Sequence, residues 1–116
     1  MAGVIQIPWY ATGFRGDSLE EALARIAPVA LRYGATDYRL YRSRDDRYQF
    51  TQMATFAEKR AFTAYWEGPE FTEFRVLQSG SYQIPVLYGW TDLVVCGGLS
   101  PEVIAGGHAG TSVAAG

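Results

Sequence analysis

The stretch of sequence that decides the fold covers residues 47–83 and reads RYQFTQMATFAEKRAFTAYWEGPEFTEFRVLQSGSYQ. Its first part, Arg47–Phe56, alternates polar and apolar residues, which is typical of a strand with one buried face. Its second part, Ala57–Trp66, repeats apolar residues at helical spacing. Pro69 then interrupts the helix and suits the first position of a second short helix. A strand-like run begins at Tyr82, so this stretch predicts a strand, a broken helix and another strand.

The segments before this stretch predict two more strands and one more helix. Val4–Tyr10 is rich in β-branched and aromatic residues, and Pro8 inside it favours an edge position or a bulge because proline lacks a ladder donor. Ser18–Tyr33 has helical periodicity after a capping box at its start, and Pro28 should bend this helix. Gly34 suits the position just after the helix end. Thr36–Arg42 alternates again and leads into a polar hairpin turn.

The C-terminal part predicts a fourth strand and a tail. Tyr82–Val95 alternates large apolar residues with smaller or polar ones, and Pro85 again favours an edge or a bulge. Gly, Ala, Ser and Thr dominate after this run, and we expect disorder from Ala105 because so little can be buried there. We therefore expect one folded domain over residues 1–96 and a flexible Gly- and Ala-rich tail over residues 97–116.

The composition restricts the class of protein. The chain has 116 residues, of which 48% are hydrophobic and 15% aromatic, which suits one folded domain. A formal net charge of -2 gives no basis for binding nucleic acid or an anionic membrane. The single cysteine, Cys96, excludes an intramolecular disulfide and a cysteine-based zinc cluster, and it fits a reducing compartment. Because neither a signal peptide nor a transmembrane run is recognisable, we expect a cytoplasmic protein.

The predicted order β-α-β-β-α-β indicates an α+β, ferredoxin-like fold: an antiparallel sheet with helices on one face. Two further features are the strand that runs directly into the second helix and the restart of that helix at Glu67-Gly68-Pro69-Glu70-Phe71. With this element order, the chain resembles the dimeric α+β-barrel proteins of the antibiotic-biosynthesis-monooxygenase type over Val4–Val95. In that family two subunits pack their sheets into a shared barrel, and the last strand extends over the partner. The resemblance therefore implies a homodimer. The many large apolar residues after Tyr82, in so short a chain, favour the same expectation.

The resemblance also implies a kind of chemistry. Some members are cofactor-free oxygenases of polycyclic phenols and quinols, in which a substrate carbanion reduces oxygen directly. Haem-degrading members carry an axial His on the second helix, whereas the only His of this chain is His108 in the tail, so we expect no cofactor. A Trp that many members place where the third strand meets the second helix is Phe56 here.

Two functions follow as expectations. The first is a cofactor-independent monooxygenase-like protein that acts on a small aromatic or polyketide-like substrate. The alternative is a non-catalytic dimeric module that binds a small hydrophobic ligand or a protein partner. A pocket with convergent polar groups between sheet and helices would favour the enzyme, and an interior filled by aromatic side chains would favour the module.

Four residues are candidates for a catalytic site, and each also has a structural interpretation. Tyr65 could donate a hydrogen bond to a substrate phenolate, or it could pack in the core. Trp66 could form the wall of a pocket, or it could pack at the surface or in the dimer. Gln52 falls on the apolar face of its strand, where its amide either orients a substrate oxygen or binds a neighbouring hydroxyl. Arg75 could bind an anionic substrate oxygen, or it could pair with a nearby glutamate.

Overall fold

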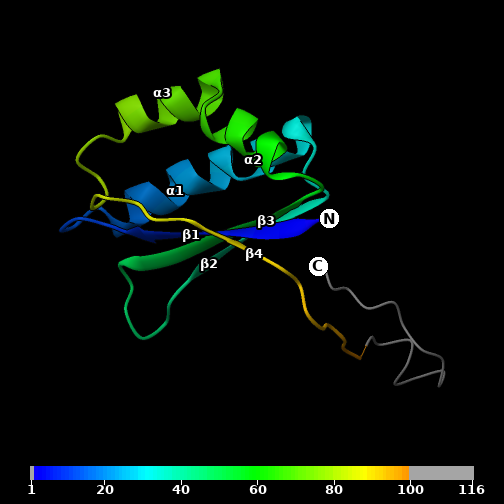
Figure 1. The fold of residues 1–116 in the computed structure, drawn as a ribbon. Coiled ribbons are helices and arrows are strands. Elements are labelled where there is room, and N and C mark those ends of the chain that lie inside the picture. Colours follow the sequence, from blue (N-terminus) through cyan, green and yellow to red (C-terminus); the bar gives the residue numbers. More distant parts are fainter. Residues whose placement is uncertain (1, 100–116) are drawn as a thin grey trace.

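A four-stranded antiparallel sheet carries all the helices of the described residues on one of its faces (Figure 1). The computed structural model describes residues 2–99. Its strands lie in the order β2-β3-β1-β4. This is the ferredoxin-like α+β fold that the sequence predicts. Along the chain the elements are β1 (Gly3–Tyr10), α1 (Gly16–Ile26), the 3-10 helix η1 (Pro28–Tyr33), β2 (Asp37–Arg42), β3 (Gln49–Phe56), α2 (Lys59–Trp66), α3 (Pro69–Leu77) and β4 (Gly89–Thr91).

The two central strands turn one apolar face toward the helices. β1 pairs with β3 along its whole length, from Gly3 opposite Phe56 to Tyr10 opposite Gln49. Because side chains alternate across a strand, every second residue of each strand is buried under the helices. The predicted buried face of β3 is therefore confirmed. These helix-facing residues include Ile5, Ile7, Trp9, Phe50, Gln52, Ala54 and Phe56.

Pro8 lies in a regular stretch of β1, opposite Thr51, without a bulge. The N–H of Ala11 donates to the carbonyl of Tyr48, and N–H groups alternate sides along a strand, so position 8 faces away from β3. On that side β4 pairs only with Val4–Gln6. The expectation of an edge strand or a bulge is therefore wrong, since β1 lies between β3 and β4 with a regular register. Pro8 is tolerated because its missing donor faces a part of β1 that β4 does not pair with.

The first helical segment is broken at Pro28 rather than bent. α1 ends at Ile26, and Pro28 is the first residue of η1. Proline cannot donate the bond that would continue the α-helix, and its ring crowds the preceding turn. Gly34 ends η1 in the left-handed conformation with φ 101°, as its predicted role at the helix end requires.

The predicted capping box at the start of this helix is wrong. α1 begins at Gly16, and the carbonyl of Arg15 accepts the first helical bond from the N–H of Leu19. Ser18 therefore already lies inside the first turn, and no side chain caps the helix. Local sequence did not reveal this earlier start, because it depends on how the loop after β1 enters the helix.

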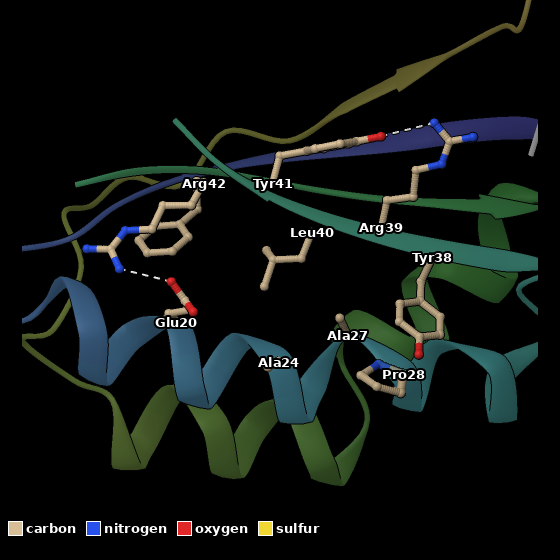
Figure 2. A pocket seen from close by; sticks show the side chains of 10 residues that line it. Glu20, Ala24, Ala27, Pro28, Tyr38, Arg39, Leu40, Tyr41 and Arg42 are labelled. Atoms are coloured by element: carbon tan, nitrogen blue, oxygen red, sulfur yellow. Dashed lines mark hydrogen bonds and ion pairs between the residues drawn. The ribbon is translucent and has the colours of Figure 1, made fainter. Parts of the chain in front are cut away.

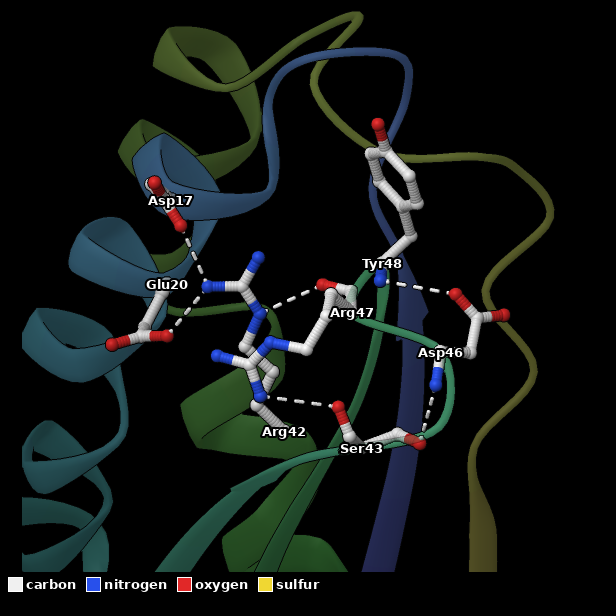
Figure 3. Close-up of polar contacts among 7 residues, drawn as sticks. All are labelled: Asp17, Glu20, Arg42, Ser43, Asp46, Arg47 and Tyr48. Atoms are coloured by element: carbon white, nitrogen blue, oxygen red, sulfur yellow. Dashed lines mark hydrogen bonds and ion pairs between the residues drawn. The ribbon is translucent and has the colours of Figure 1, made fainter.

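Short polar side chains hold the hairpin turn between β2 and β3, as predicted (Figure 3). Ser43 Oγ accepts hydrogen bonds from the N–H groups of Asp45 and Asp46 at 3.2 and 3.0 Å. Asp46 Oδ1 accepts one from the N–H of Tyr48 at 3.1 Å. These bonds extend the turn, so β3 begins at Gln49, slightly later than the alternation predicts.

The helix after β3 is interrupted at the position that the sequence predicts. Gly68 precedes α3 in an extended conformation, and Pro69 is the first residue of α3. The chain passes very close to its neighbours here: a Cβ atom on Gly68 would lie 2.6 Å from the Tyr33 hydroxyl and 2.8 Å from the Ala64 carbonyl oxygen. Glycine is therefore required at this break for its lack of a side chain.

The last strand is much shorter than predicted. Only Gly89–Thr91 pairs with β1, and Tyr82 makes an isolated bridge with Ala11. The expectation of a continuous strand over Tyr82–Val95 is therefore wrong. Pro85 lacks the N–H that a ladder needs, so the chain crosses this part of the sheet edge without regular pairing.

The expected tail lies largely outside the described residues, including the whole segment from Ala105. The boundary between residues 96 and 97 stays a prediction. Within residues 2–99, no helix has both the length and the apolar character needed to cross a membrane.

Replacing Gly68 should destabilise the fold in proportion to this crowding. We expect Gly68→Ala to lower the free energy of unfolding by about 1–3 kcal/mol, because backbone and a packed tyrosine must move to admit the methyl group. Gly89→Ala is the matched control, since a Cβ at Gly89 has no heavy atom within 4 Å. Urea unfolding of both variants measures the difference. Equal stability of the two variants would contradict the close approach at Gly68.

Candidate functional site

A buried chain of hydrogen bonds joins the sheet to the helices at the centre of the protein. Trp9 Nε1 donates to Gln52 Oε1 at 3.0 Å, and Gln52 Nε2 donates to the Tyr65 hydroxyl at 3.0 Å. The Tyr65 hydroxyl donates in turn to the Ile26 carbonyl oxygen at 2.5 Å. That carbonyl lies at the end of α1, where helical carbonyls lack partners within the helix. Four separate elements, β1, β3, α2 and α1, are connected in this way.

These hydrogen bonds already use the polar groups of Tyr65 and Gln52. Both residues are only 1% exposed. Burial raises the pKa of the Tyr65 phenol well above its ordinary range, because a phenolate would lose its hydration there. The phenolic hydrogen is already donated to Ile26, and the Gln52 oxygen already accepts from Trp9. At neutral pH Tyr65 is therefore an uncharged group that binds other parts of the chain.

Aromatic side chains fill the space around these bonds. The Trp9 ring packs against Phe71, Phe74 and Tyr82, with centroids 6.1, 5.4 and 4.9 Å apart. Tyr65 packs edge-on against Phe71 at 4.9 Å. Edge-to-face contacts of this kind are favourable beyond the area they bury. The interior between sheet and helices is thus occupied by side chains at the level of Gln52.

Arg75 and Trp66 form a second group at the margin of this aromatic interior. The Arg75 guanidinium carbon lies 4.9 Å from the Trp66 ring centroid and 5.3 Å from that of Phe71. Arg75 Nη2 donates to the Trp66 carbonyl oxygen at 2.7 Å. Arg75 Nη1 is buried and has no hydrogen-bond partner among residues 2–99. An unsatisfied buried N–H is costly, and a cationic one attracts an anionic acceptor.

Neither Glu70 nor Glu73 forms an ion pair with Arg75 in the described part of the chain. Glu70 instead accepts a hydrogen bond from the Tyr33 hydroxyl and lies 3.6 Å from Arg32. That hydroxyl, together with Arg32, lowers the pKa of the Glu70 carboxyl. The guanidinium of Arg75 is therefore held by a backbone carbonyl and by aromatic faces.

The structure brings the four candidate residues into one cluster with two ends. Gln52 and Tyr65 are hydrogen-bonded to each other at its closed end, and Arg75 stacks on Trp66 at the other end. Trp9 connects the ends, since its ring also lies 6.1 Å from that of Trp66. Trp9 is not among the four candidates from the sequence. Its spacing from Ile5 and Ile7 was the available signal, because it puts Trp9 on the same face of the strand.

A separate groove of about 620 Å³ runs between α1 and β2 (Figure 2). None of the four candidate residues lines it. In Figure 2 the side chains of Tyr38, Leu40 and Arg42 point from β2 toward α1, and those of Arg39 and Tyr41 point to the opposite face of the sheet. On the side of α1 and η1, the groove is lined by Glu20, Ala24, Ala27 and Pro28.

Acidic, cysteine and histidine side chains do not gather into a metal-binding group of three or more anywhere in residues 2–99. The described part of the chain therefore offers no candidate metal centre.

Comparisons with known structures show what this fold is similar to. A protein from Nitrosomonas europaea described as an antibiotic biosynthesis monooxygenase aligns with a TM-score of 0.73 and 14% identity, over 80% of this chain and 90% of that one. SnoaB, a cofactor-independent oxygenase from Streptomyces nogalater, aligns with a TM-score of 0.68 and 18% identity, over 81% and 94% of the two chains. A protein from Bordetella bronchiseptica, likewise described as an antibiotic biosynthesis monooxygenase, gives 0.71 and 17%, over 81% and 98%.

These likenesses establish the class of fold. The chain has the α+β fold of antibiotic-biosynthesis-monooxygenase-type proteins, as the sequence predicts. Neither the family models nor the curated proteins that were compared match the sequence. At identities below 20% the likeness is one of fold, and function has to be argued from the site.

Tyr65→Phe should show whether the phenol is held neutral in the fold. Near pH 8 the loss of its hydrogen bonds should cost about 1–3 kcal/mol of stability. The raised pKa keeps Tyr65 protonated in the folded state, whereas the unfolded chain ionises near pH 10, so wild-type stability from this group falls as pH rises above 10. The disadvantage of Tyr65→Phe should therefore shrink by about 1.4 kcal/mol at pH 11. Urea unfolding at both pH values measures it, and an unchanged difference would contradict the assignment.

Proposed function

We propose that this protein is a homodimeric module of monooxygenase-like fold that binds a small aromatic molecule carrying an anionic oxygen. The observation that carries the proposal is the buried Nη1 of Arg75, which has no acceptor within residues 2–99. A phenolate, enolate or carboxylate oxygen would supply that acceptor as a charge-assisted hydrogen bond. The aromatic part of the ligand would lie against Trp66, whose ring Arg75 already covers.

Access to this position would come from movement of residues 83–88. Tyr88 packs on Trp66 at 5.3 Å, so this segment covers the site. Gln83 N–H donates to the Tyr10 carbonyl at one end of the segment, and Gly89 begins β4 at the other. Between these two points Ile84 and Leu87 expose most of their side chains. For this segment to open, Tyr88 must leave Trp66 and Phe62, whose ring it contacts at 4.8 Å, and Val86 must leave the core. A ligand could then replace Tyr88 on the indole.

Each candidate residue has a role in this proposal. Arg75 holds the anionic oxygen, and Trp66 stacks on the ligand. Gln52 and Tyr65 act as positioning residues, since their hydrogen bonds fix Trp9 and so fix the packing beneath Trp66. Because their own polar atoms are already paired, binding without turnover is the use that the interior supports best.

Cofactor-independent oxygenation is the second candidate function. The observation that favours it is again Arg75, since a cation among aromatic rings would stabilise the anion of a phenol or quinol. Such an anion could transfer its electrons directly to dioxygen, as in the oxygenases that the chain resembles. The substrate would then have to ionise before or during binding, because Tyr65 is not available as a base.

Arg75→Met should separate these functions from simple packing. An anthrone probe in its anionic form, followed by tryptophan fluorescence, should bind the wild-type protein and bind Arg75→Met at least about tenfold more weakly. The exposed Arg60 gives the control, since Arg60→Met should bind like the wild type. Oxygen consumption above the protein-free rate that disappears in Arg75→Met would establish the oxygenase, and binding without consumption the module. Equal probe binding by Arg75→Met and the wild type would refute the site.

The dimer is proposed from apolar residues that are exposed within residues 2–99. Val94 and Val95 are 88% and 82% exposed where the chain leaves the sheet after β4. Nearby, Leu93 lines a small pocket on the sheet face opposite the helices, together with Asp37. Asp37 Oδ2 is buried and has no hydrogen-bond partner within the described residues. A second copy on this face would cover the valines and could supply the missing donor.

Charged substitutions in this segment should weaken the dimer. We expect the wild type to have the mass of a dimer at micromolar concentration by light scattering. The double variant Val94→Asp/Val95→Asp should have half that mass, because buried carboxylates would oppose association. Val76→Asp, on the exposed side of α3, is the control and should stay dimeric. A monomeric wild type, or a double variant with unchanged mass, would exclude this interface.

A further inference from the structure

A narrow crevice of about 210 Å³ lies between α1 and α3. The two helices are in contact and run in opposite directions above the sheet (Figure 1). None of the four candidate residues lines this crevice, and it shares no lining residue with the groove between α1 and β2. The crevice is therefore separate from both.

Apolar side chains form the floor and walls of the crevice. Ala22 and Ile26 line it from one face of α1, and Phe74 lines it from α3. These three residues are 3%, 5% and 6% exposed, and the single methyl group of Ala22 leaves space that a larger side chain would fill. Val29 and Leu77 form the apolar walls, and Leu77 is 70% exposed. A ligand in the crevice would therefore remove apolar surface from water, most of it on Leu77.

Opposite charges border the crevice on its two sides. Arg25 on α1 and Glu73 on α3 both line it, and each directly precedes a floor residue in the sequence. Both residues are exposed. Neither forms an ion pair within residues 2–99, so the two charges do not neutralise each other across the crevice.

The charge of the other glutamate in the crevice is already balanced. Glu70 accepts a hydrogen bond from the Tyr33 hydroxyl at 2.5 Å and lies 3.6 Å from Arg32. These contacts also join the end of η1 to the first turn of α3, which fixes the spacing of the two helical segments at that end. Arg25 and Glu73 are then the charges that a ligand meets.

We propose that this crevice binds a free α-amino acid with an aliphatic side chain, of the size of leucine or methionine. The α-carboxylate lies toward Arg25 and the α-ammonium toward Glu73, each as a charge-assisted contact. The aliphatic side chain enters the space above Ala22 and covers Leu77. The two charges and the apolar part of such a molecule match the order of charges and apolar surface in the crevice.

Charge and size together select this class of ligand. A simple anion would be repelled by Glu73 and a simple cation by Arg25, whereas a zwitterion satisfies both. An uncharged apolar molecule would leave both charges without a contact. The volume is also below the range of about 300–1,000 Å³ that is typical of sites for drug-sized ligands, so a polycyclic aromatic molecule does not fit.

A titration with four small molecules tests the proposal on the wild-type protein. L-leucine, followed by amide chemical shifts of isotope-labelled protein at low ionic strength, should shift Ala22, Ile26 and Phe74 and saturate with a Kd on the order of 1 mM, because exposed ion pairs are weak. Isocaproate lacks the ammonium group, isoamylamine lacks the carboxylate, and each should bind at least about threefold more weakly. L-alanine keeps both charges without the aliphatic part and should bind at least about tenfold more weakly. Equal affinity for all four molecules, or no saturable shift at these residues, would overturn the proposal.

Two charge-removing variants assign the ends of the ligand. Arg25→Gln should bind L-leucine about threefold more weakly and should no longer prefer it to isoamylamine, because the carboxylate has lost its contact. Glu73→Gln should instead lose the preference for L-leucine over isocaproate. Glu21→Gln and Arg60→Gln remove exposed charges that do not line the crevice, and both should bind like the wild type. If all four variants keep the wild-type preferences, Arg25 and Glu73 do not hold the ligand and the proposal fails.

Discussion

The hydrogen bonds from Trp9 through Gln52 and Tyr65 to the Ile26 carbonyl are the interaction on which the rest of the structure depends. They join β1, β3, α2 and the end of α1 inside an otherwise apolar interior. A buried amide is expensive unless its oxygen and nitrogen both find partners, and here both do. Because each donor in this series of hydrogen bonds has one acceptor, the series determines how the helices lie on the sheet.

Because these hydrogen bonds use the polar atoms at the centre of the interior, a ligand has to find its polar contacts elsewhere. Tyr65 and Gln52 cannot serve a ligand without giving up bonds that hold the fold together. Arg75, at the margin of the aromatic interior, is different, because one of its buried nitrogens has no partner in residues 2–99. A fold of the monooxygenase type is therefore combined with an interior filled by side chains and a cationic position beside Trp66. The proposed recognition of an aromatic anion rests on this combination.

The two edge strands of the sheet, β2 and β4, differ in length and surroundings. At β4 the pairing is reduced to three residues, and the chain continues past it with exposed valines. At β2 a full strand ends the sheet, with a groove beneath it and its arginine already paired to acids of α1. Both features leave surface exposed within residues 2–99. For the segment after β4, the proposed consequence is association of two copies.

The sequence by itself determined the element order, the buried face of β3, the break at Pro69 and the end of η1 at Gly34, because each depends on local periodicity or on a residue with restricted backbone geometry. It also selected Gln52, Tyr65, Trp66 and Arg75. Only the tertiary structure decided that Gln52 and Tyr65 bind each other, that Trp9 joins them, and that Arg75 stacks on Trp66. It likewise decided where α1 begins and how little of residues 82–95 pairs. These outcomes depend on contacts between residues far apart in the chain, and such contacts leave no periodic signal in the sequence.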